Sequence, residues 1–164
     1  MPQRLLAADS GPLIALGKLG LLHLPAALYD DVLVTQTVWV EVTVGPPRAE
    51  HAALHAAHDS GWLKLVDDPP DTAGGFGAPG LDEGERTALV LAQQEHCDLL
   101  IDERRGREAA RSARLEVLGT LGVLSRARQL GLIGPVRPLI ERLLAARYHL
   151  APALVAHALS ALGE

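Results

Sequence analysis

The sequence contains little sulfur and few aromatic rings. Cys97 is the only cysteine, and Phe, Trp and Tyr together make up 3% of the 164 residues. A single thiol cannot build disulfides within the chain, which suits a reducing cytosol. Few rings are left to stack on bases, so stacking is not expected to dominate any contact with nucleic acid.

The sequence also shows little that resembles a targeting or membrane-spanning segment. The first five residues, MPQRL, lack the basic start and the long apolar run of a signal peptide. No stretch approaches the ~18 uninterrupted apolar residues that a membrane span needs. We therefore expect a cytoplasmic protein that does not enter a membrane. The formal net charge of −5 argues against a generally basic surface for nucleic acid.

Apolar side chains, at 48%, are abundant enough for a sizeable core, and the length favours a single domain over residues 1–164. Short apolar runs alternate with helical patterns along the first 130 residues. This alternation predicts a three-layer α/β fold in which helices flank a central, mostly parallel sheet. The predicted strands are 4–8, 31–34, 62–66, 98–101 and 115–118. The predicted helices are 12–22 with a break near Gly20, 47–59, 82–96, 104–114 and 120–130, and two more at 136–146 and 152–162 that pack on the domain.

Two segments fit this alternation less simply. Residues 67–80 are rich in Pro, Gly and Asp, which predicts a surface loop. In the segment 37–44, every second residue from position 38 onward is a valine, and the residues between them are Trp, Glu and Thr. This period and composition are typical of a strand.

Two predicted strands end in an acid. Asp9 follows the apolar run 5–8, and Asp102 follows the run 99–101. In open parallel sheets, ligands bind outside the carboxyl ends of the strands, so both side chains are expected at one site. A core strand has no need of an acid at its end, although an Asp there also makes a good N-cap for the following helix.

A third acidic position begins the predicted helix 82–96. Glu85 belongs to the run LDEGE at 81–85, where acids also favour the helix dipole. The dipole accounts well for Asp82 and Glu83. The apolar residues that follow Glu85 indicate that its own side chain lies at the inner edge of the helix.

Carboxylates gathered at one edge of a sheet repel one another. A pair ~4 Å apart repels by about 4 kcal/mol at an effective dielectric of 20. A divalent cation removes this repulsion, and Mg²⁺ prefers oxygen ligands. Such a site can activate water for attack on a phosphodiester, whereas no Cys and His set has the spacing of a zinc site.

A metal-dependent phosphatase usually needs a second acid two residues after its nucleophilic Asp, and Asp9 is followed by Ser10 and Gly11 instead.

Basic residues are concentrated in one part of the chain. Seven of the 15 Lys and Arg residues fall between positions 104 and 128. Arg104, Arg105 and Arg107 come just after the second strand-ending acid, where they would hold RNA phosphates beside the acids. The alternative is a solvated helix face on which arginines pair with neighbouring glutamates.

Four blocks of sequence carry a family resemblance. They are DSGPLIAL at 9–16, LDEGERTAL at 81–89, LLIDERRGR at 99–107 and VLGTLGVL at 117–124. In this order they resemble PIN-domain proteins, specifically the toxin-like subgroup DUF3368. The resemblance implies a PIN fold and a ribonuclease that uses Mg²⁺ or Mn²⁺. It also suggests a VapC-like toxin that a small antitoxin protein neutralises.

The resemblance also implies roles for individual residues. The catalytic and metal-binding acids would be Asp9, Glu41, Glu85 and Asp102, with Glu103 as an additional metal ligand. Ser10 and Thr120 match polar positions that orient the ligands. Because the family places Glu41 on a helix, we expect a helix over 36–44 in place of the strand pattern. Thr35 stands where the family often has a proline.

We therefore predict a metal-dependent endoribonuclease, the toxin of a toxin–antitoxin pair, with RNA as its substrate. The expected protein partner is the antitoxin. Apolar stripes on the two C-terminal helices suit core packing, and they would also suit a homodimer. The alternative is a non-catalytic PIN-like module that binds nucleic acid or a protein partner.

Overall fold

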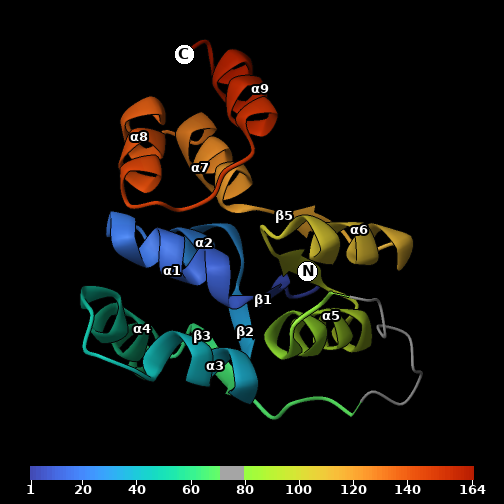
Figure 1. The fold of residues 1–164 in the computed structure, drawn as a ribbon. Coiled ribbons are helices and arrows are strands. Elements are labelled where there is room, and N and C mark those ends of the chain that lie inside the picture. The colour runs from blue at the N-terminus through green and yellow to red at the C-terminus, as the bar shows by residue number, and fades with distance from the viewer. Residues whose placement is uncertain (71–79) are drawn as a thin grey trace.

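The computed structural model describes residues 1–70 and 80–164, and its centre is a five-stranded parallel sheet (Figure 1). The strands lie in the order β3-β2-β1-β4-β5, and each pairing is parallel. Their bounds are β1 (Leu5–Ala8), β2 (Asp31–Thr35), β3 (Leu63–Val66), β4 (Asp98–Leu100) and β5 (Val117–Leu118).

Helices cover both faces of this sheet. Figure 1 shows α1 and α4 on one side, and α5 and α6 on the other. This three-layer α/β arrangement confirms the predicted fold class. In the described residues the helices are α1 (Ser10–Leu19), α2 (Leu24–Leu28), α3 (Gln36–Thr43), α4 (Ala49–Asp59), α5 (Glu83–Glu95), α6 (Arg104–Ser112), α7 (Thr120–Gln129), α8 (Arg137–Ala145) and α9 (Pro152–Leu162).

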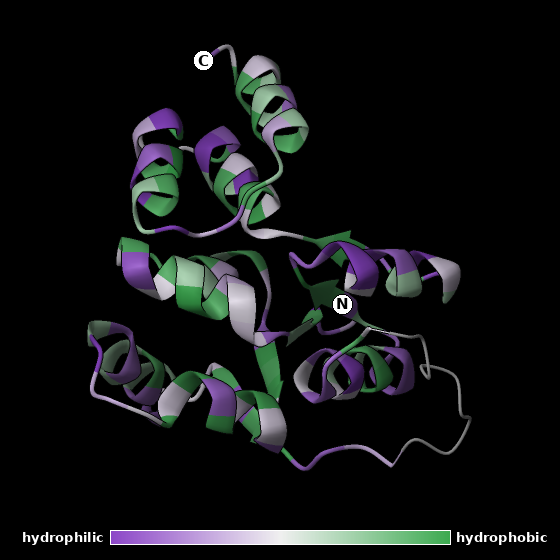
Figure 2. Cartoon of the chain, in the orientation of Figure 1, coloured by the Kyte–Doolittle hydropathy of each residue, from purple (hydrophilic) through white to green (hydrophobic). Residues whose placement is uncertain are grey.

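Aliphatic side chains fill the space between the layers. The central strands appear largely green in Figure 2, as expected for parallel strands that are buried on both faces. Leu6, Leu99 and Leu100 have no exposed surface. Aliphatic residues therefore make up most of the core, as the composition requires, and Tyr29 is an aromatic residue buried among them.

The winding of the chain reverses at β1, which lies between β2 and β4. Ala8 is in register with Leu100, so the last residues of β1 and β4 lie side by side. Reversal points of this kind are where open parallel sheets bind ligands, at the carboxyl edge. Asp9 follows β1 directly, and Asp102 follows β4 by two residues.

The segment that contains Glu41 is the helix α3, as the family resemblance implied, and the strand pattern read from its valines was wrong. Thr35 begins this helix, and its hydroxyl accepts a hydrogen bond from the Val38 nitrogen at 3.3 Å. Val38 and Val42, four residues apart, are buried on one face of the helix, whereas Val40 is 51% exposed. Tertiary packing thus overrides the β propensity of valine.

Smaller differences from the sequence predictions lie at turns. The first helix ends at Leu19, and Gly20 takes a left-handed conformation (φ 71°), which confirms the break predicted there. The short helix α2, with Pro25 in its first turn, was not predicted. Of the predicted loop 67–80, residues 71–79 lie outside the described residues.

The two predicted C-terminal helices are α8 and α9. They pack against α1 and α7 respectively. Among residues 1–70 and 80–164, no helix combines the length and apolar character needed to cross a membrane.

Candidate active site

Asp9 is a buried acid with an unused oxygen. It takes the N-cap position of α1, but its side chain makes no capping hydrogen bond. The residue is 5% exposed, and its Oδ1 is buried with no hydrogen-bond partner among the described residues. The pKa of Asp9 is raised to about 7, mainly because burial disfavours the charged form. A hydrogen bond from the Ser10 backbone lowers the pKa, and the negative charges of Glu85, Asp82 and Glu41 raise it. A buried carboxylate oxygen that the described residues leave without a hydrogen bond needs an explanation.

Glu85 lies beside Asp9 and also caps α5. Its backbone nitrogen donates to Asp82 Oδ1 at 2.8 Å, and its own Oε2 accepts from the Asp82 nitrogen at 3.0 Å. The two bonds form a reciprocal capping box, so Glu85 does stabilise the N-terminus of α5, which was the alternative role that the sequence left open. Burial raises the pKa of Glu85, and the charges of Asp82, Glu103 and Glu41 add to the effect.

Glu41 reaches the same place from α3. A Cβ built on Gly84 would lie 2.4 and 2.6 Å from the two Glu41 carboxylate oxygens, so the carboxylate rests where a side chain at position 84 would be. The Ser10 hydroxyl donates to this carboxylate and lowers the pKa of Glu41, but burial has the larger, opposite effect and the net shift is upward. The missing side chain of Gly84 is therefore part of how the site forms, which the sequence pattern did not reveal.

Asp102 is held by donors from the C-terminal half of the chain. Its Oδ1 accepts from the Thr120 nitrogen at 2.8 Å, and its Oδ2 accepts from the Thr120 hydroxyl at 2.6 Å. Oδ2 also accepts from the hydroxyl of Tyr148. The contact with Thr120 is the kind that the resemblance implied for an orienting residue.

Tyr148 is a second residue at this site, besides Gly84, that sequence reasoning missed. It lies between α8 and α9, in no recognisable motif, and its hydroxyl would be 3.2 Å from a Cβ built on Gly11. Burial raises the pKa of Tyr148, and the negative charges of Asp102 and Asp9 raise it further. The hydroxyl therefore stays protonated at neutral pH and acts as a donor.

Glu103 and Arg104 lie at the start of α6 and face solvent. Glu103 is exposed, and its charge raises the pKa of Glu85, so the two acids are electrostatic neighbours. The Nε of Arg104 pairs with Glu108 at 2.9 Å while its side chain stays 87% exposed. Such exposed pairs contribute little to stability and break easily.

Arg105 and Arg107 take different positions. The guanidinium of Arg105 lies against Gly80, at the edge of the described residues. Arg107 is half-buried, and its Nη1 and Asp102 Oδ1 would lie 2.5 and 2.8 Å from a Cβ built on Gly119. Burial lowers the pKa of Arg107, against the opposing effect of Asp102. Arg107 thus brings positive charge directly to the acidic edge.

A model of the DUF3368 family, described as a PIN domain, matches residues 5–164. The chain belongs to the PIN-domain family. A search of the curated proteins found no match to it. PIN domains are typically nucleases that act with divalent metal ions, and the acids of this PIN domain gather at the carboxyl edge of its sheet.

The acidic edge of the PIN domain fits a divalent cation by its chemistry. A cation would bind the Asp9 Oδ1, for which the described residues supply no partner, and would relieve the mutual repulsion of Asp9, Glu85 and Glu41. Within the described ranges, no three His, Cys, Asp or Glu side chains converge closely enough to hold an ion by themselves. Mg²⁺ is usually held by one or two carboxylates together with water and substrate phosphate, so a full protein cage is not required.

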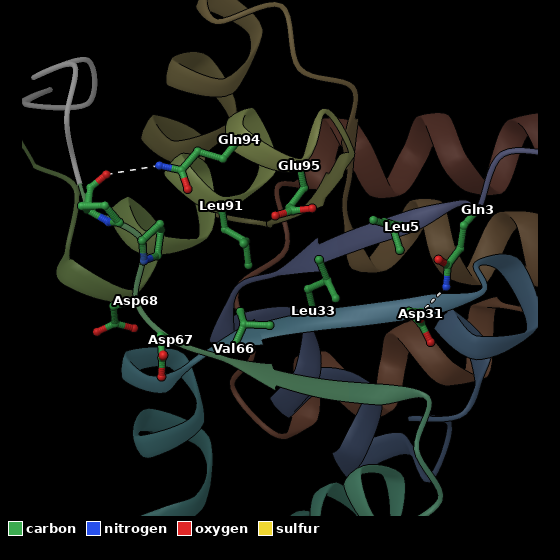
Figure 3. A pocket seen from close by; sticks show the side chains of 12 residues that line it. Gln3, Leu5, Asp31, Leu33, Val66, Asp67, Asp68, Leu91, Gln94 and Glu95 are labelled. Carbon is green, nitrogen blue, oxygen red and sulfur yellow. Dashed lines mark hydrogen bonds between the residues drawn. The ribbon is translucent and has the colours of Figure 1, made fainter.

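A pocket of about 420 Å³ lies apart from these acids (Figure 3). Gln3 and Asp31 are at one end of it, Asp67 and Asp68 are at the other, and Leu33 lies between. None of the predicted catalytic acids lines it. The candidate active site is therefore the open carboxyl edge of the sheet and not this cavity.

Proposed function

We propose that this PIN-domain protein is a Mg²⁺- or Mn²⁺-dependent endoribonuclease. The observation that carries the proposal is the buried Asp9 Oδ1, which has no donor in the described part of the chain and lies near the charges of Glu41, Glu85 and Asp82. A purely structural acid at this N-cap position would be expected to accept a capping hydrogen bond from the second or third residue of the helix, and the Asp9 side chain makes no capping bond. The proposed catalytic acids are Asp9, Glu41, Glu85 and Asp102.

Each of these acids has its own proposed role. Asp9 and Glu41 would provide oxygen ligands, while Ser10 orients the Glu41 carboxylate. Glu85 and Asp102 would face the same ion or its waters, with Glu103 as a further ligand at the rim. When bound, a divalent cation would neutralise these charges, activate water and stabilise charge on the phosphate.

The reaction is hydrolysis of an RNA phosphodiester. The oxygen of water adds to phosphorus and the bond from phosphorus to the 3′ oxygen breaks, which leaves a 5′-phosphate and a 3′-hydroxyl. Arg104 and Arg105 are exposed and would hold flanking phosphates. Arg107, next to Asp102, would hold the phosphate nearest the acids.

The proposed setting is the cytoplasm, where the protein would act as a VapC-like toxin that a small antitoxin protein inhibits. This part rests on membership of the DUF3368 family. Leu144 on α8 and Leu154 on α9 are 48% and 45% exposed, and either of these apolar side chains would suit a contact with the antitoxin or with a second copy of the chain.

The test is an RNA-cleavage assay on purified protein with Mg²⁺, with EDTA, and with the Asp9→Asn variant. Asp59→Asn, which removes an equal charge from the exposed end of α4, is the matched control. We expect cleavage by the wild type and by Asp59→Asn with Mg²⁺ only, and none by Asp9→Asn. Cleavage in EDTA, or by Asp9→Asn at the wild-type rate, would contradict the proposal.

A second candidate is a non-catalytic PIN-like module that binds nucleic acid or a protein partner. It is favoured by the finding that no three metal-ligating side chains converge in the part of the chain that is described. Such a module should bind RNA without any Mg²⁺-dependent turnover. Binding measured beside the cleavage assay separates the two functions.

A further inference from the structure

We propose that Tyr148 is a positioning residue of this active site, which fixes the Asp102 carboxylate through its hydroxyl. The inference rests on the proposed function, because it assigns Asp102 to the metal site. No motif of the sequence pointed to Tyr148. The structure places it there through a hydrogen bond to Asp102 Oδ2 that spans 46 residues of chain.

The donors around Asp102 leave one direction open. A carboxylate has about four acceptor sites, two on each oxygen. Oδ2 accepts from both the Thr120 and the Tyr148 hydroxyls, whereas the one donor to Oδ1 within residues 1–70 and 80–164 is the Thr120 nitrogen. Tyr148 therefore completes the bonding of Oδ2 and leaves the free acceptor site on Oδ1. Without it, rotation of the carboxylate would be restrained by Thr120 alone.

The backbone that carries Tyr148 is itself well defined. The Tyr148 nitrogen donates to the Leu143 oxygen at 2.9 Å, and the Arg147 nitrogen donates to the Leu144 oxygen at 3.0 Å. With Arg147 at φ 59°, these two bonds form a Schellman motif that ends α8 and turns the next residue inward. Gly11, at the start of α1, leaves room for the hydroxyl at 3.2 Å from where a Cβ would be.

The helix behind this turn is anchored at both ends. The backbone nitrogens of Val136 and Arg137 donate to the Glu164 carboxylate, at 2.8 and 2.9 Å to Oε2. Ile140 and Leu143 are buried against the rest of the protein. The C-terminal segment after the last strand is thus a rigid support that delivers one hydroxyl to the acidic edge.

The experiment compares Tyr148→Phe with Tyr29→Phe, which the fold offers as a matched control. Tyr29 also donates its hydroxyl to an aspartate, Asp98 Oδ2 at 2.6 Å, but at the start of β4. Both variants keep the ring and lose one hydrogen bond to a carboxylate, and Tyr29→Phe also loses the bond that its hydroxyl accepts from Arg126 at 3.2 Å. Measurements are Mn²⁺ affinity by calorimetry, kcat and KM for RNA cleavage with Mg²⁺, and Tm in EDTA.

We expect Tyr148→Phe to weaken Mn²⁺ binding and to lower kcat, each by roughly tenfold or more, as is usual when a partner of a metal ligand is lost. KM for RNA should stay within about twofold, because the hydroxyl bonds to Asp102 and not to the arginines that would hold RNA. Tyr29→Phe should leave Mn²⁺ affinity and kcat unchanged.

A Tyr148→Phe protein that binds Mn²⁺ and cleaves RNA like the wild type would overturn the positioning role and leave the proposed function standing. A wild type that binds no Mn²⁺ and cleaves no RNA would overturn both. Should Tyr148→Phe fail to fold, Gly11→Ala tests the same contact, since its methyl group would crowd the hydroxyl at 3.2 Å. It should then weaken Mn²⁺ binding, and wild-type affinity in this variant would count against the inference.

Discussion

The main-chain nitrogen of Asp9 donates to the carbonyl oxygen of Leu100 at 2.9 Å. This hydrogen bond extends the β1–β4 pairing by one residue and ties the first acid to the end of the strand that precedes Asp102. Two acids that are 93 positions apart in the sequence thereby share the carboxyl edge of the sheet.

Asp9→Asn should stabilise the metal-free protein at pH 8. Burial raises the pKa of Asp9 from 3.8 to about 7 in the folded protein, so the folded state binds this proton more tightly than the unfolded chain does. The free energy of unfolding therefore falls as pH rises from about 4 to about 7, and the loss is complete above that range. At about 1.4 kcal/mol for each pKa unit, the gain from Asn is at most about 4 kcal/mol.

The measurement is urea unfolding in EDTA at pH 8 and at pH 4. Near pH 4 the wild-type carboxyl is protonated in the folded protein, so the advantage of Asp9→Asn should shrink strongly there. Added Mg²⁺ should stabilise the wild type at pH 8 and have little effect on the variant. A variant that is less stable than the wild type in EDTA at pH 8 would show that the acid is structural.

Gly84→Ala should lower cleavage without destabilising the fold. Its methyl group would occupy the place of the Glu41 carboxylate, which is the end of a flexible side chain on an exposed residue and can swing away. Alanine also favours a helix interior by up to about 1 kcal/mol over glycine. Cleavage assays and Tm together check both parts.

The dependence on Glu41 is tested by combining variants. If Gly84→Ala acts by displacing that carboxylate, it should cause no further loss in a Glu41→Gln background. Additive losses in the double variant would mean that Gly84 matters for some other reason.

Thr120→Val should reduce cleavage by about 10- to 100-fold, the usual cost of losing a partner of a metal ligand. The buried hydroxyl donates to Asp102 Oδ2 at 2.6 Å, and valine keeps the shape without the donor. Thr120→Ser retains the donor and should recover most of the activity. Equal loss in both variants would point to packing and not to orientation of Asp102.

Replacing Arg104 and Arg105 together by Gln should raise KM for RNA and leave kcat nearly unchanged. Both side chains are exposed, so they would meet phosphates away from the reacting bond. For single strands, each lost phosphate contact should reduce the slope of log affinity against log salt by about 0.7. The measurement is RNA-binding affinity at salt concentrations from about 50 to about 200 mM, where salt changes affinity strongly. The control is Arg142→Gln, which removes an exposed positive charge from α8. An unchanged slope would remove these arginines from the RNA surface.

Much of the fold could be predicted because its signals are local. Buried parallel strands read as short apolar runs, and an acid directly after such a run marks the carboxyl edge. Residues 36–44 show where local reading fails: four alternating valines indicate a strand, yet Val38 and Val42 pack together as one face of a helix. Only the family resemblance predicted the helix there, because it rests on where the family places Glu41 and not on the β propensity of valine.

The amino-acid sequence by itself determined most of the order of strands and helices, the acids that follow β1 and β4, and membership of the PIN-domain family. Tertiary structure alone decided that Gly84 makes room for Glu41, and that Tyr148 reaches Asp102 from beyond α8. Periodicity and capping depend on neighbours within a few residues, so a sequence displays them. Contacts between side chains from distant segments depend on how all three layers pack, and no local pattern encodes them.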